Sequence, residues 1–143
     1  MPINEGHVGR SYPPTAPYQL STAKIAEFAA ALGDGNPAYA GDSPLAPPTF
    51  AVVLAGAAWG AMFADPELDL QLSRTVHTDQ RFTWTRQLRA MDEVTAALTI
   101  QKVRARGTTA FITIDVDLVD AAGEPVCTAT STLLHTWPAE VAA

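Results

Sequence analysis

The sequence predicts an α+β fold in which an antiparallel sheet wraps around a central, buried helix. Two observations lead to this prediction: a nearly continuous apolar helical segment over residues 48–63, and four long alternating segments between residues 74 and 137. A helix that is apolar on almost all sides is buried on most of them. At 143 residues, with 48% hydrophobic residues, the chain is expected to form one domain over residues 1–143.

The first predicted helix follows a proline-rich leader, residues 1–20, and lies in "STAKIAEFAAALGDG". Ser21 or Thr22 can cap its first turn, and Gly33 can end it. Apolar residues recur at helical spacing on one face: Ile25, Phe28, Ala29 and Leu32. This helix is therefore short and amphipathic, and it leads directly into the loop "GDGNPAY".

The second predicted helix lies in "PPTFAVVLAGAAWGAMFADP" and forms the centre of the fold. Pro48 suits the first helical position, where its missing N–H would be unpaired in any case. Large apolar side chains surround the helix, among them Phe50, Val53, Leu54, Trp59 and Phe63. Small residues between them allow a neighbouring backbone to come close.

The alternating segments are "RTVHTDQRFTWTRQL", "DEVTAALTIQKVRA", "TTAFITIDVDLVD" and "PVCTATSTLLHTW". The turn-bearing breaks "RAMDE", "RGT" and "AAGEP" separate them, which predicts a meander of antiparallel strands in chain order. A strand such as "TTAFITIDVDLVD", if left at a sheet edge, would pair with other chains unless it is covered. We therefore expect a dimer, either of this chain or with a second chain.

The charge balance excludes some partners and favours others. A net charge of -6 and a pI near 4.8 oppose binding to nucleic acid. Seven of the nine Lys and Arg residues lie between positions 74 and 106, where they form either a local basic patch for an acidic cofactor such as CoA or ordinary solvated strand edges. No metal-ligand spacing is present, the single Cys127 fits a small buried hydrophobe, and the apolar segments fit neither a signal peptide nor a membrane span. We expect a soluble cytoplasmic protein without membrane association.

Four stretches resemble one known family: "KIAEFAAALGDGNPAY", "APPTFAVVL", "VHTDQRFTWTRQLRAMDEV" and "DAAGEPVCTATSTLLHT". The family is the MaoC-like group of hotdog dehydratases and hydratases, of the N-terminal-domain type. Within it, the chain is most similar to the substrate-side subunit of two-subunit (3R)-hydroxyacyl-ACP dehydratases. The resemblance implies a hotdog fold, reversible loss of water from an acyl thioester carried on CoA or acyl carrier protein, no cofactor, and an acyl tunnel between helix and sheet.

The catalytic loop departs from the family pattern. Active members carry Gly-Asp-x-Asn-Pro-x-His, whereas this chain has Gly33, Asp34, Asn36 and Pro37 followed by Tyr39 at the histidine position. Tyrosine, with a pKa of roughly 10, is a poor base near neutrality. The candidate catalytic residues are therefore Asp34 and Tyr39. The alternative is that Asp34 simply closes the turn with Asn36.

The chemistry of enoyl hydration suggests a substrate-binding set as well. The reaction needs a base, an acid and hydrogen-bond donors for the thioester oxygen. Pro47 and Pro48 have no N–H, so Thr49 and Phe50 are the first possible donors at the helix N-terminus, unless this turn only starts the helix. The candidate substrate-binding residues are Asn36, Pro47, Thr49, Phe50 and Trp59.

Three functions remain open on the sequence. The first is an acyl-thioester-binding subunit without a complete Asp/His pair, paired with a second hotdog chain in fatty acid or polyketide metabolism. The second is a self-sufficient homodimeric hydratase that uses Asp34. The third is a hotdog acyl-CoA thioesterase, which would need a carboxylate near the helix N-terminus, where "APPTFAVVL" has none. His7, His77 and His135 lie far from the loop in sequence and are interpreted as structural.

Overall fold

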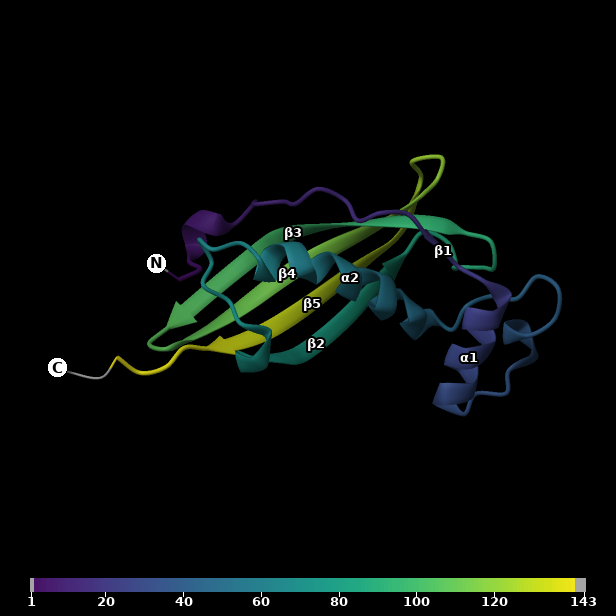
Figure 1. Ribbon diagram of the computed structural model, residues 1–143, viewed down its shortest axis with the longest axis horizontal. Coiled ribbons are helices and arrows are strands. Elements are labelled where there is room, and N and C mark those ends of the chain that lie inside the picture. Colours follow the sequence, from purple (N-terminus) through teal and green to yellow (C-terminus); the bar gives the residue numbers. More distant parts are fainter. Residues whose placement is uncertain (1, 141–143) are drawn as a thin grey trace.

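A computed structural model describes residues 2–140 of the chain, in which a curled antiparallel sheet of five strands packs around one helix (Figure 1). The predicted α+β architecture is confirmed. The helices are α1 (Thr22–Leu32) and α2 (Ala51–Phe63), with 3₁₀ turns at η1 (Glu5–His7), η2 (Pro37–Tyr39), η3 (Pro48–Phe50) and η4 (Leu72–Arg74). The strands are β1 (Tyr18–Gln19), β2 (Thr75–Trp84), β3 (Glu93–Arg106), β4 (Thr109–Asp120) and β5 (Pro125–Thr136).

The strand order is β1-β3-β4-β5-β2, which corrects part of the sequence prediction. The β3–β4 and β4–β5 hairpins form as predicted, but β2 pairs with β5 in antiparallel register, from Thr75 opposite His135 to Trp84 opposite Cys127. The expectation of a meander in chain order is therefore wrong at its first step. The break "RAMDE" is part of a crossover, anchored where the Thr85 N–H donates to the Val126 carbonyl at 2.9 Å.

The same topology shows which strand lies at the sheet edge. Strand β4 is central, with β3 on one side and β5 on the other, and it is β2 that ends the sheet. The predicted alternation on β4 is confirmed, since Ile112, Ile114 and Val116 are buried while Phe111 is 47% exposed. Alternation shows which face of a strand is buried, but it does not show which neighbours the strand has.

The leader covers the edge of the sheet opposite β2, where it packs along β3. The N–H groups of Gly9, Tyr12 and Thr15 donate to β3 carbonyls at 2.8, 3.0 and 2.9 Å. Its prolines, including Pro13 and Pro14, have no N–H to offer, and proline is tolerated on an edge strand for that reason. The leader thus protects β3 over most of its length (Figure 1).

Helix α2 lies across the concave side of the sheet (Figure 1). Its sheet side is buried through Ala51, Leu54, Ala55, Ala58 and Met62. The expectation of burial on nearly all sides is not met in the single chain, where Val53 is 43% exposed. The physical reason is that one curled sheet contacts one side of a helix, so the opposite apolar side needs another partner.

Helix α1 has the ends that the sequence predicts. The Ser21 hydroxyl accepts a hydrogen bond from the Lys24 N–H at 3.0 Å, and Gly33 ends the helix with a φ of 66°. Ile25 is fully buried, as expected for the apolar face of the helix. Leu32, assigned to the same face, lies in the last turn and is 52% exposed, so it does not join the core. Within residues 2–140, no helix is both long and apolar enough to cross a membrane.

Candidate functional site

The loop after α1 is shaped by the residues that match the family motif. The Asp34 carboxylate accepts a hydrogen bond from the Asn36 N–H at 3.0 Å, and the Asn36 side chain accepts one from the Ala38 N–H at 3.0 Å. Pro37 then begins η2 at a position that requires no N–H. Asp34 is exposed, so the carboxylate that accepts this hydrogen bond within the turn also faces solvent.

A shallow hollow of about 240 Å³ joins the predicted catalytic residues. Asp34, Asn36 and Tyr39 line it together with small residues of α1. The Tyr39 ring is half-buried and packs against the hydrophobic core. A carboxylate, an amide and a phenol can bind and orient a polar group here, but the hollow includes no imidazole to act as a base near neutrality.

The predicted thioester-binding turn is divided between surface and core. Pro47 is buried and Thr49 is exposed at the surface. Phe50 is fully buried, and its ring meets Phe28 edge-on with ring centres 5.1 Å apart. The Phe50 N–H donates to the Pro47 carbonyl at 2.9 Å, so the turn itself uses one of the two expected donors. Phe50 therefore supports the start of α2 from within the core.

Trp59 lies further along α2, apart from the other predicted binding residues. Its ring meets His77 of β2 with centres 5.2 Å apart and planes inclined by 75°. The indole N–H is buried, and no acceptor within residues 2–140 satisfies it. Trp59 lines neither the hollow at Asp34 nor the groove described next.

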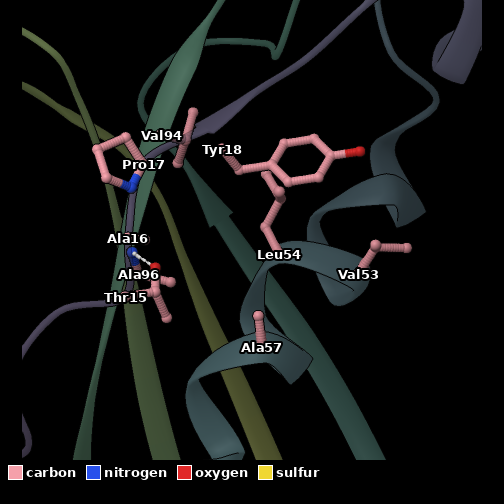
Figure 2. A pocket seen from close by; sticks show the side chains of 9 residues that line it. All are labelled: Thr15, Ala16, Pro17, Tyr18, Val53, Leu54, Ala57, Val94 and Ala96. Carbon is pink, nitrogen blue, oxygen red and sulfur yellow. Dashed lines mark hydrogen bonds between the residues drawn. The ribbon is translucent and has the colours of Figure 1, made fainter.

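A larger apolar groove, of about 440 Å³, runs between α2 and the leader (Figure 2). Val53, Leu54 and Ala57 of α2 form one wall, Val94 and Ala96 of β3 form the base, and residues 15–18 of the leader form the other wall. The Tyr18 ring extends over the helix at the end of this groove (Figure 2). Sequence reasoning missed these residues because they come from three separate segments.

One signal for the groove was present in the sequence. The leader places Tyr12 and Tyr18 among prolines, a composition compatible with an edge strand that has one apolar side. The Ala96 N–H donates to the Thr15 hydroxyl at 3.0 Å, while the Thr15 N–H donates to the Ala96 carbonyl at 2.9 Å. This reciprocal pair fixes the leader as the groove wall.

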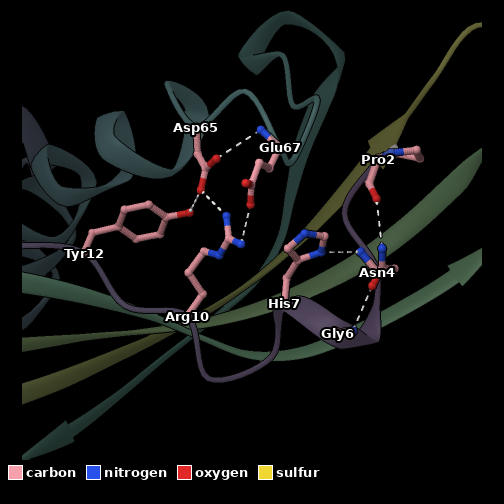
Figure 3. A network of polar contacts seen from close by, with 8 residues as sticks. All are labelled: Pro2, Asn4, Gly6, His7, Arg10, Tyr12, Asp65 and Glu67. Carbon is pink, nitrogen blue, oxygen red and sulfur yellow. Dashed lines mark hydrogen bonds and ion pairs between the residues drawn. The ribbon is translucent and has the colours of Figure 1, made fainter.

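Charged residues attach the leader to the end of α2 (Figure 3). Asp65 Oδ2 accepts from the Tyr12 hydroxyl at 2.7 Å and from Arg10 at 2.8 Å, while Arg10 also contacts Glu67 at 2.5 Å. The Tyr12 hydroxyl, followed by Arg10, holds the pKa of Asp65 below its usual value. Burial, followed by the Asp65 hydrogen bond, raises the pKa of Tyr12. The cluster is structural, and it keeps the leader in place.

The three histidines lie away from the hollow at Asp34. His7 accepts a hydrogen bond from the Asn4 N–H at 3.0 Å, which caps η1. His135 is fully buried and its Nε2 accepts from the Gln71 N–H at 3.0 Å. Burial lowers the pKa of His135 and so favours its neutral form. Together with His77 against Trp59, this leaves both the hollow and the groove without a histidine in residues 2–140.

The predicted basic patch is partly neutralised. Arg86 pairs with Asp92 at 2.8 Å and with Asp120 at 3.2 Å, where it joins the crossover to the end of β4. The hydrogen bond to Asp92 is the main reason that the pKa of Arg86 is raised. Arg81 lies 3.3 Å from Asp79. Cys127 is buried as predicted, and burial raises the pKa of its thiol to about 11.

Comparison with known sequences places the chain among relatives of nearly equal length. The family model of the FAS1-like dehydratase domain region matches residues 6–129. A UPF0336 protein of Cutibacterium acnes is 56% identical over 138 residues, which cover 96% of this chain and 97% of that protein. A UPF0336 protein of Leifsonia xyli is 43% identical, with 94% of this chain and 96% of that protein covered.

Comparison with solved structures agrees with the fold. The C-terminally truncated HadBC (3R-hydroxyacyl-ACP dehydratase) complex of Mycobacterium tuberculosis contains a chain with a TM-score of 0.76 and 25% identity, covering 90% of this chain and 96% of that chain. A MaoC-like dehydratase has a TM-score of 0.81 and 26% identity over 92% of this chain and 43% of its own. The ChsH1-ChsH2 complex of Mycobacterium tuberculosis contains a chain with a TM-score of 0.64 and 19% identity, covering 90% of this chain and 91% of that chain. This is a likeness in fold.

The curled sheet around α2, the loop residues Gly33, Asp34, Asn36 and Pro37, and the match over residues 6–129 point to the same family. The chain belongs to the FAS1-like dehydratase region family and has the hotdog fold of the MaoC-like dehydratases and hydratases.

Proposed function

We propose that this chain is the acyl-thioester-binding subunit of a (3R)-hydroxyacyl-ACP or hydroxyacyl-CoA dehydratase, and that a second hotdog chain supplies the catalytic Asp/His pair. The observation that carries the proposal is the loop at Gly33–Tyr39. It keeps the turn, with Asp34 bonded to Asn36, but it has Tyr39 where a catalytic histidine is expected. In this proposal the chain binds and positions the acyl group while its partner performs the proton transfers.

The apolar groove supports the binding role. Its lining by Val53, Leu54, Ala57 and Val94 offers a hydrocarbon chain an environment from which water is displaced at little cost. Tyr18, at one end, has its ring 6.4 Å from that of Phe50, so the groove is continuous with the core that supports the start of α2. An acyl chain bound here would place its thioester toward the α2 N-terminus, where Thr49 is exposed.

The exposed edge of the sheet supports pairing with another hotdog chain. Strand β2 is ten residues long and, within residues 2–140, pairs only on its β5 side. An edge of this length is normally covered, twisted away or paired. Related folds occur in the HadBC and ChsH1-ChsH2 complexes, which supports a hotdog partner at this edge.

The proposal is tested with the purified chain and enoyl-CoA substrates of increasing length, beginning with crotonyl-CoA. We expect saturable binding of the longer acyl-CoAs, measured by calorimetry, but hydration slower than that of an active hydratase by about a hundredfold or more. Co-purification with a hotdog chain that carries both Asp and His should restore hydration. Absence of acyl-CoA binding, both alone and with such a partner, would contradict the proposal.

The second candidate is the self-sufficient homodimeric hydratase, which the shared hollow of Asp34, Asn36 and Tyr39 favours. The Asp34→Asn variant separates the two functions, because asparagine keeps the side-chain acceptor of the turn but cannot exchange protons. Under our proposal this variant binds acyl-CoA like the wild type. If the chain alone hydrates enoyl-CoA at ordinary enzymatic rates and Asp34→Asn abolishes the reaction, the homodimeric enzyme is correct.

The third candidate, a thioesterase, is tested by following CoA release in the same assay. The turn from Pro47 to Ala51 carries no carboxylate that could activate water at the start of α2. We therefore expect no release above the background of spontaneous hydrolysis.

A further inference from the structure

The convex face of the sheet carries two groups of opposite charge at fixed places in the strand register. On β3, Lys102, Arg104 and Arg106 alternate with the buried Val103 and so point to the convex side. Register places Arg104 opposite the exposed Phe111. Arg104, Arg106, Thr109 and Phe111 share a hollow of about 460 Å³, which confirms that they lie together.

Two carboxylates lie further along the same face. Asp115 and Asp117 of β4 alternate with the buried Ile114 and Val116, as Phe111 does with Ile112. The hydroxyls of Thr130 and Thr128 donate to them at 2.5 and 2.7 Å. A carboxylate has about four acceptor positions, so each of the two can accept further donors.

These charges have no partners of opposite charge within the described part of the chain. The cations that form ion pairs within residues 2–140 are Arg10, Lys24, Arg81 and Arg86. None of these pairs involves the charged side chains on the convex face of β3 and β4. The convex face therefore presents cations without an ion-pair partner beside the start of β4, and carboxylates without an ion-pair partner at Asp115 and Asp117 further along the same strand.

We propose that this face binds the same face of a second copy of the chain through a two-fold axis that crosses the strands at Thr113. Residues at equal distances on either side of Thr113 exchange places under such an axis. Position 111 then faces position 115, and position 109 faces position 117. Arg104 lies beside Phe111 and Arg106 lies beside Thr109, so Arg104 reaches Asp115 of the second copy and Arg106 reaches Asp117.

The symmetry makes every contact occur twice, as an interface between identical copies requires. Thr113 at the axis is small enough to let the two sheets approach. Under this axis the row of Phe111 and Leu134 faces the row of Asp115 and Thr130 of the second copy, so the contact rests on the charged pairs.

Other occupants fit this pattern less well. An extended anionic surface, such as a membrane or a nucleic acid duplex, would meet the cations and the carboxylates together. Strand geometry puts position 111 only about 14 Å from position 115, so a flat anionic surface cannot contact one group and avoid the other. A second copy uses both groups.

The surface is independent of the proposed dehydratase role. The groove and the Asp34 loop lie on the concave side with α2 and at the α1 end, and β2 remains free at the sheet edge. Association through the convex face therefore doubles the mass of whatever unit forms through the edge, whether or not that unit binds acyl thioesters.

The test is a charge exchange between two variants, followed by sedimentation velocity over micromolar concentrations of the full-length chain. Arg104→Glu and Asp115→Lys should each raise the dissociation constant of the association through the convex face by about tenfold or more, since each creates two like-charge contacts. Mixing the two variants should restore association, because the introduced carboxylate then faces the introduced amine while the native Arg104 and Asp115 face each other. Lys24→Glu and Glu140→Lys, which change the charge equally at exposed positions elsewhere, should associate like the wild type.

Restoration in the mixture also shows that both variants are folded. The proposal is overturned if the wild-type chain shows no doubling of mass, if the control variants weaken association as much as Arg104→Glu, or if mixing the two variants restores nothing.

Discussion

The Tyr12 hydroxyl donates a hydrogen bond of 2.7 Å to Asp65 Oδ2, joining the proline-rich leader to the segment that follows α2. The two residues are separated by 53 positions in sequence, and Arg10 joins their contact (Figure 3). This cluster attaches the leader, whose residues 15–18 form one wall of the apolar groove. The groove is therefore a product of long-range contacts, and its stability can be tested one hydrogen bond at a time.

Removing this hydroxyl should destabilise the protein. We expect Tyr12→Phe to lower the free energy of unfolding by about 1.5 to 3 kcal/mol, the usual range for a hydrogen bond to a charged group. Urea unfolding at neutral pH measures the loss. Tyr18→Phe is the matched control, since the Tyr18 hydroxyl makes no hydrogen bond within residues 2–140, and equal losses in both variants would contradict the assigned role of Tyr12.

Acid should weaken the same contact. The pKa of Asp65 is lower in the folded chain than in the unfolded one, so the stability it contributes is fully present above the unfolded value of roughly 4 and is lost as pH falls through the folded value. The Asp65→Asn variant should be less stable than the wild type at neutral pH, with a difference that narrows as pH falls below about 4. Urea unfolding of both proteins across this range measures the difference, and a constant difference would contradict the prediction.

Phe50 should contribute more to stability than to ligand contact. It is fully buried between Phe28 and Tyr18, so Phe50→Ala should cost about 3 to 5 kcal/mol through lost burial and the cavity left behind. Phe111→Ala on the convex face is the control and should cost much less, because Phe111 is 47% exposed. Thermal unfolding compares them, and similar losses would show that the core at Phe50 is not packed as described.

Filling the groove should block acyl binding without unfolding the chain. Ala57 lines the groove and is exposed, so a leucine there adds bulk where a bound acyl chain would lie. We expect Ala57→Leu to weaken the binding of long acyl-CoAs by about tenfold or more, as loss of apolar burial for two methylene groups would do. Ala61→Leu, on α2 but outside the groove lining, is the control, and calorimetry with both variants distinguishes a blocked groove from a general effect on the helix.

The local structure follows from the sequence alone. Ser21 and Gly33 set the ends of α1 because a side-chain acceptor and a positive φ are needed at those positions whatever the surroundings. Alternation on β4 showed which residues are buried, and Gly33, Asp34, Asn36 and Pro37 identified the turn, with Tyr39 following where the family that the loop resembles has a histidine. These features depend on neighbours within a few residues, and a sequence displays such neighbours directly.

Which segments pack together is set by long-range contacts in the folded chain. The pairing of β2 with β5, the leader along β3, the exposed side of α2 and the groove through Ala57 and Ala96 all join residues far apart in the chain. Strand periodicity is the same for any choice of neighbour, and a proline-rich leader has the same composition whether it packs on an edge or remains free. Long-range hydrogen bonding and packing choose among these arrangements, because burying the edge of β3 and the apolar side of the sheet stabilises one of them over the others.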